Sequence, residues 1–145
     1  MITCTKNYRD IPLSHRQPLH QGKCSRLHGH SWSISITFEA EKLDENGFVV
    51  DFGELHFIED WIDQHLDHGI VLSLEDPQKE ILSDLQKLGL LSITWVPSPS
   101  CEGISQFLFD TFQPMVKEKT QGRAQIQSIR LEEDSKNSSF YKPQK

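Results

Sequence analysis

The stretch from residue 31 to residue 40 constrains the fold most, because polar and apolar side chains alternate along it without a break. A period of two is typical of a strand that buries one face, as in an antiparallel sheet with water on its other side. Such a strand needs an apolar layer against its buried face, which the rest of the chain must supply. The apolar positions are Trp32, Ile34, Ile36, Phe38 and Ala40.

Three helical stretches are predicted to supply that layer. Residues 53–67 carry leucines and isoleucines at spacings of three and four, which gives an amphipathic helix. A shorter helix is predicted from Asp76, followed by a proline, to Gly89. Ser100 is expected to cap a third helix, in which Pro114 predicts a kink or an end.

The remaining segments complete an α+β domain. An Asn-Gly turn at residue 47 predicts a hairpin whose second strand is residues 48–50. Residues 91–96 and 125–133 are predicted to be further strands, and the polar tail from Lys136 onward is expected to be loose. We therefore expect a single domain over residues 1–145, with antiparallel strands and helices laid on one face.

Charge and cysteine content narrow the class of protein. The formal net charge is -6, which argues against a general nucleic-acid or membrane-surface binder, although a local basic patch could still bind an anionic substrate. Three cysteines without dense spacing do not indicate a disulfide framework, and free thiols fit a reducing cytosol. No apolar signal core or membrane-spanning stretch is found, so a cytoplasmic protein is expected.

A metal site is predicted around the sequence His28-Gly29-His30. Residues two apart in an extended chain point to the same side, so both imidazoles can converge on one ion, and imidazole nitrogen suits zinc. His15 on the preceding segment is the preferred third ligand, because the rival His20 has the neighbours of an exposed loop. Three protein ligands leave one position open, as in catalytic zinc sites. Paired histidines also occur by chance on exposed strands.

Candidate acid–base groups have structural alternatives. Cys24 could be a proton carrier, since a nearby zinc ion and basic residues favour its thiolate, or it could be a small buried apolar residue. Asp67 and His68 could form an oriented acid–base pair or simply end a helix. Glu133 continues the apolar row of the last strand and could accept hydrogen bonds from a ligand, or it could reach solvent. Its neighbour Glu132 falls on the polar face.

Taken in order, these motifs resemble the 6-pyruvoyltetrahydropterin synthase / 6-carboxytetrahydropterin synthase family. The similarity runs from about Tyr8 to Tyr141 and rests on the sequence elements Cys24-x3-His28-Gly29-His30, Gly47-Phe48-Val49-Val50-Asp51-Phe52, Leu66-Asp67-His68, Glu102 and Glu133, with His15 upstream. The resemblance implies the tunnelling fold, with an antiparallel four-stranded sheet and two main helices on one face. It also implies a homohexamer of two stacked trimers, with the active site between subunits.

The resemblance further implies a role for each matched residue. His15, His28 and His30 would bind zinc, and Cys24 would accept a proton. Asp67 and His68 would form a proton relay. Glu133 would anchor the pterin ring, with Glu102 near the same pocket.

The short gap between Cys24 and His28 resembles the queuosine-pathway branch of the family. That branch converts 7,8-dihydroneopterin triphosphate into 6-carboxy-5,6,7,8-tetrahydropterin, with release of acetaldehyde and triphosphate. Arg16, Lys23 and Arg26 are the basic candidates for the triphosphate, with surface solvation as their alternative. A 6-pyruvoyltetrahydropterin synthase or related pterin side-chain lyase is the alternative enzyme, and a non-catalytic zinc- or pterin-binding module is the alternative of another class.

Overall fold

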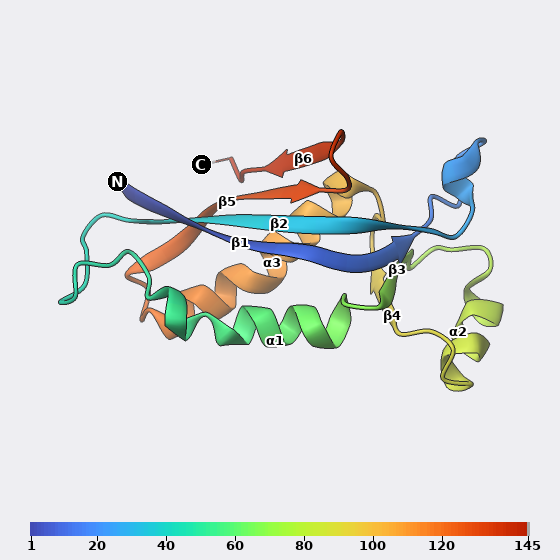
Figure 1. Ribbon diagram of the computed structural model, residues 1–145, viewed down its shortest axis with the longest axis horizontal. Helices are drawn as coiled ribbons and strands as arrows, with labels where there is room; N and C mark the ends of the chain where they lie inside the picture. The colour runs from blue at the N-terminus through green and yellow to red at the C-terminus, as the bar shows by residue number, and fades with distance from the viewer. Residues whose placement is uncertain (145) are drawn as a thin grey trace.

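Six strands form one mixed sheet in residues 1–144, the part of the chain that the computed structural model describes (Figure 1). Their order across the sheet is β4-β3-β1-β2-β5-β6. The strands are β1 (Ile2–His15), β2 (His28–Ala40), β3 (Gly69–Ser73), β4 (Ile93–Val96), β5 (Ala124–Glu132) and β6 (Ser138–Tyr141).

The sheet is larger than the resemblance implied. The pairs β1–β2, β2–β5 and β5–β6 are antiparallel, and these four strands account for the four that the resemblance implied. Strand β3 then adds parallel to the end of β1, and β4 adds parallel to β3. The expectation of four purely antiparallel strands is therefore corrected to six strands with two parallel pairings.

The two longer helices lie on the same side of the sheet, where they cover its apolar face (Figure 1). These are α1 (His56–His65) and α3 (Cys101–Lys119), both close to the predicted positions. Asp51 caps the short 3-10 turn η2 (Phe52–Glu54) that leads into α1, and Ser100 caps α3. Helix α3 continues through Pro114.

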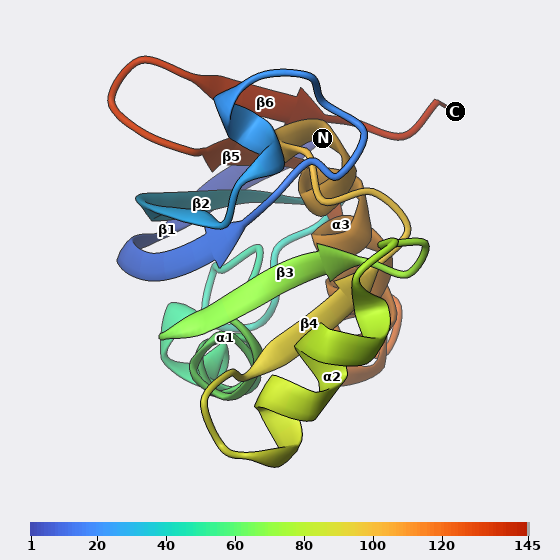
Figure 2. The same ribbon diagram turned by 90° about the vertical axis from the view of Figure 1, so that its right-hand side faces the viewer.

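The third helix, α2 (Lys79–Lys87), joins β3 to β4 and lies beside them at one end of the molecule (Figure 2). Ile70 and Leu72 of β3 contact Leu82 of α2 in a small apolar cluster, whereas Val71 belongs to the main core. Because neighbouring strand residues point to opposite faces, β3 is buried on both sides.

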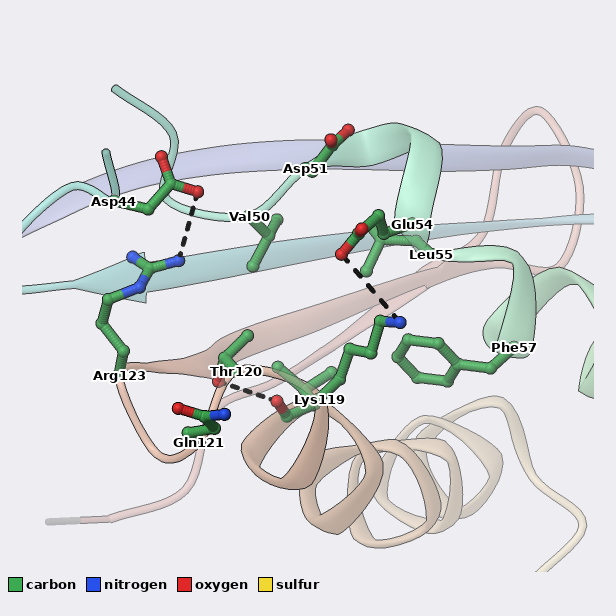
Figure 3. Close-up of a pocket in the computed structure, with 11 residues that line it drawn as sticks. Asp44, Val50, Asp51, Glu54, Leu55, Phe57, Lys119, Thr120, Gln121 and Arg123 are labelled. Atoms are coloured by element: carbon green, nitrogen blue, oxygen red, sulfur yellow. Dashed lines mark hydrogen bonds and ion pairs between the residues drawn. The ribbon is translucent and has the colours of Figure 1, made fainter. Parts of the chain in front are cut away.

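Residues 48–50 do not form the predicted second strand of a hairpin. Strand β2 already has β1 and β5 on its two edges, so no edge is left for them. The carbonyl groups of Phe48 and Val49 instead accept hydrogen bonds from the guanidinium of Arg123. Figure 3 shows a hollow beside these residues, with Val50 and Arg123 among the side chains that line it.

Strands β1 and β6 also depart from the sequence-based expectations. The tail was expected to be loose, but β6 pairs with residues 129–132 of β5. Residues 2–15 carried no strand prediction, because a bulge between Tyr8 and Ile11, with Asp10 at a φ of 57°, interrupts the alternation. Within residues 1–144, no helix is both long and apolar enough to cross a membrane.

Candidate metal centre and active site

The pairing of β1 with β2 brings three histidines together. His15 lies directly opposite His28, and His30 lies opposite Leu13, which shares a strand face with His15. Cross-strand neighbours on one face have Cβ atoms about 5 Å apart, so the three imidazoles must meet. Their ring centroids are 4.6 to 5.4 Å from one another. His20 lies outside this cluster, and its Nδ1 accepts from the backbone N–H of Gly22.

Backbone carbonyls fix the tautomer of two of these rings. Nδ1 of His15 is 2.8 Å from the carbonyl oxygen of Pro99, and Nδ1 of His28 is 2.7 Å from that of Arg26. A carbonyl oxygen only accepts, so each Nδ1 must carry the proton. In the neutral rings this leaves Nε2 with a free lone pair, the arrangement that metal-bound histidines adopt.

Glu133 is the fourth member of the cluster. Its Oε1 lies 2.8 Å from Nε2 of His30 and 3.2 Å from Nε2 of His15. Neither contact has hydrogen-bond geometry, so both buried Nε2 atoms lack a hydrogen-bond partner among the described residues. The four candidate ligand atoms lie within 4.8 Å of one another.

This donor set fits a divalent cation. Burial lowers the pKa of His15, which favours the neutral imidazole that a metal requires. A neutral Nε2 facing a carboxylate oxygen is unfavourable unless a cation lies between the two lone pairs. Three imidazoles with one carboxylate form a ligand set that zinc accepts. The side chains therefore fit the expected zinc ion, with Glu133 within reach as well as the three histidines.

Cys24 lies in the loop that joins β1 to β2, within the 3-10 turn η1 (Lys23–Ser25). Cys24 is exposed in the single chain, unlike the buried apolar residue of the alternative. It lines one hollow of about 520 Å³ together with His15, Glu102 and Glu133. The candidate proton carrier and two of the clustered side chains therefore face the same space.

Asp67 and His68 follow α1 and contact each other through Oδ1 and Nδ1. The backbone of His68 has a φ of 56°, a left-handed conformation that is uncommon for a residue other than glycine. A backbone hydrogen bond from its N–H to the carbonyl of Pro12 holds it there, with the imidazole exposed. His68 lines two hollows, one with His30 and one with His28, and neither includes Cys24.

The two glutamates at the end of β5 face opposite ways, as the strand period predicts. Glu133 reaches the histidines, whereas Glu132 pairs with Arg130 at 3.7 Å. The contact between Glu133 and the imidazoles was missed at the sequence level. The alternation predicted which face of the strand Glu133 occupies. Only the pairing of β1, β2 and β5 brings the ends of these strands together.

Comparisons with known proteins point to one family. A family model described as 6-pyruvoyl tetrahydropterin synthase matches residues 3–144. A 6-carboxy-5,6,7,8-tetrahydropterin synthase from Rickettsia typhi is 34% identical over 116 residues, which cover 79% of this chain and 82% of the relative. The enzyme of that name from Aquifex aeolicus is 27% identical over 123 residues, which cover 83% and 76%.

Solved structures support the fold. An uncharacterized protein from Wolinella succinogenes superposes with a TM-score of 0.84 at 19% identity and covers 99% of this chain and 98% of its own. A 6-pyruvoyl tetrahydropterin synthase from Plasmodium vivax gives 0.64 at 15% identity, with 97% and 98% covered. The chain therefore has the α+β tunnelling fold that the resemblance implied, with six strands in place of four.

Proposed function

The chain belongs to the 6-pyruvoyl tetrahydropterin synthase family, and from this membership we propose that it is a zinc-dependent 6-carboxytetrahydropterin synthase. The proposed reaction converts 7,8-dihydroneopterin triphosphate and water into 6-carboxy-5,6,7,8-tetrahydropterin, acetaldehyde and triphosphate, a step of queuosine biosynthesis. Several relatives at about 33% identity carry that name. The observation that carries the proposal is the convergence of three imidazoles, two of which are held with an Nε2 lone pair free for a metal.

His15, His28 and His30 are the proposed zinc ligands. Bound zinc would supply Lewis-acid chemistry, which polarises oxygens on the substrate side chain. Pro99 and Arg26 would hold two of the rings through their carbonyl groups.

Cys24 is proposed to take up and return a proton on the substrate side chain, because its exposed thiol lines the hollow that His15 and Glu133 also line. Asp67 is proposed to orient His68 through the contact between their side chains, so that His68 can exchange protons with the thiol. Both glutamates of that hollow, Glu102 and Glu133, are proposed to accept the N–H groups of the pterin ring.

The site is proposed to lie between copies of the chain. Cys24 and His68 line different hollows within one chain, which supports a site in which a second copy brings the imidazole to the thiol. A homohexamer of two trimers would supply that copy. Lys23 and Arg26 are the proposed triphosphate contacts, since both are exposed at the edge of the Cys24 loop. The free cysteines support the proposal of a cytoplasmic enzyme.

Product analysis with 7,8-dihydroneopterin triphosphate tests the proposal. The zinc-loaded protein should release acetaldehyde and yield a 6-carboxypterin. Accumulation of 6-pyruvoyltetrahydropterin without acetaldehyde would favour the synthase whose name the family model bears. No turnover, despite bound zinc and bound pterin, would favour a non-catalytic binding module.

A further inference from the structure

The loop between β1 and β2 must hold Cys24 in place, although little regular structure stabilises it. It contains one 3-10 turn of three residues, and Leu19 near its middle is 89% exposed. Two hydrogen bonds tie its outgoing and returning arms together. The N–H of Gln17 donates to the carbonyl of Cys24 at 2.7 Å, and Nη1 of Arg16 donates to the carbonyl of Ser25 at 2.9 Å.

Arg16 is anchored in turn by a carboxylate from a distant part of the chain. Its Nε and Nη2 donate to the two carboxylate oxygens of Asp76, each at 2.8 Å. The Asp76 side chain is fully buried and that of Arg16 is 17% exposed. A bidentate pair of this kind fixes the guanidinium in orientation as well as position.

Asp76 is itself held by the backbone around it. Its Oδ1 also accepts from the N–H of Gln78, and its own N–H donates to the carbonyl of Ser73 at the end of β3. Hydrogen bonding from Arg16 lowers the pKa of Asp76, so the carboxylate is charged at neutral pH. The charged carboxylate of Asp76 is therefore held in a fixed position next to the end of β3.

We infer that Arg16 is a positioning residue. Its guanidinium connects the loop that carries Cys24 to Asp76, which follows β3, and so holds the loop in place. This inference rests on the proposed function for the role of Cys24. It also removes Arg16 from the candidates for triphosphate binding, because three of its donor contacts are made within the chain. Lys23 and Arg26 differ, since neither side chain makes a hydrogen bond or ion pair with any described residue.

Arg16→Lys is the decisive variant, because it keeps the charge but loses the planar fork that makes three directed bonds. Lys23→Gln is the matched control within the same loop. Amide hydrogen exchange of the zinc-loaded protein is the first measurement. In Arg16→Lys the amides of Gln17, Ser25 and Arg26 should exchange roughly tenfold faster or more, as expected for the loss of a charged hydrogen bond. In Lys23→Gln their exchange should stay at the wild-type rate.

Steady-state kinetics with 7,8-dihydroneopterin triphosphate supply the second measurement. A misplaced thiol should lower kcat by about tenfold to 10²-fold with little change in KM. Bound zinc per folded chain should be unchanged. Asp76→Asn should give the same exchange pattern, and the double variant should be no worse than either single one.

Two outcomes would overturn the inference. Unchanged amide exchange in Arg16→Lys would show that the loop does not depend on the guanidinium. A raised KM with unchanged kcat in an Arg16→Gln variant would make Arg16 a substrate contact. If the wild-type protein turns over no pterin, the proposed function fails, while the exchange measurement still decides whether Arg16 holds the loop.

Discussion

Cys24 and His28 lie four residues apart, but they are proposed to do different things. Cys24→Ala should keep its zinc and lose turnover by about 10²- to 10⁴-fold, because a general acid–base group contributes that much. His28→Ala should lose zinc, because the remaining imidazoles bind a cation less well. Zinc per chain and kcat should be measured for both variants. Loss of zinc from Cys24→Ala would mean that the thiol is a ligand.

Glu133 and Glu132 form a natural pair for testing pterin recognition. Glu133→Gln keeps the shape but removes the charge that accepts paired N–H groups, so substrate affinity should fall by about 1.5–3 kcal/mol. Glu132→Gln should have little effect, since that side chain faces Arg130. Substrate dissociation constants and zinc content should be measured together. A Glu133→Gln protein that loses zinc would identify the carboxylate as a metal ligand.

At the scale of elements, the β3–α2–β4 unit is joined to the rest of the fold partly through one ion pair. It has a small apolar cluster of its own around Leu82, where Lys79 also lies over the ring of Trp95 at 5.0 Å. Only the last three residues of β1 pair with β3. The Arg16–Asp76 pair adds a second attachment next to that short pairing.

Acid should weaken this attachment. Hydrogen bonding from Arg16 holds the pKa of Asp76 below its ordinary value of 3.8 in the folded protein. The resulting stability is complete above about pH 4 and is lost as pH falls through the lowered folded-state pKa. Asp76→Asn should therefore lower the free energy of unfolding at pH 7 by about 3 kcal/mol, and by less at pH 2.

Urea unfolding at the two pH values measures this difference. Asp84→Asn on α2 is the control, because its carboxylate is 60% exposed and pairs with Lys87 at 3.5 Å. A loss of stability in Asp76→Asn that does not depend on pH would contradict the assigned role of its charge.

At the scale of the whole molecule, the separation of Cys24 from His68 can be tested by mixing variants. Cys24→Ala and His68→Ala should each be nearly inactive. If one site takes its thiol from one copy and its imidazole from another, hybrids formed by co-expression should recover activity. An equal mixture leaves about a quarter of such sites intact, counted from random assembly of identical copies. Co-expression of two differently tagged Cys24→Ala chains is the control. No recovery in the hybrids would assign both groups to one chain.

The sequence by itself determined the local features. The period of two in residues 31–40 predicted β2, and the spacing of leucines and isoleucines predicted α1. Ser100 caps α3, as the sequence predicted. These features depend on near neighbours in the chain, so the pattern alone contains them. The same reasoning put His28 and His30 on one side of a strand and Glu133 on the apolar side of another.

Only the tertiary structure decided which strands pair with one another and in which register. Residues 48–50 have a strand-like sequence, but both edges of β2 are taken, so the carbonyl groups of Phe48 and Val49 accept hydrogen bonds from Arg123 instead. Residues 138–141 lie in a polar tail, yet they form a strand because β5 offers an open edge. For the same reason, only the register of β1 against β2 brings His15 to His28. The pattern of a strand fixes which face each side chain occupies. Which distant residues lie next to that side chain depends on strand pairing, and the backbone hydrogen bonds that make the pairing are nearly the same for every sequence.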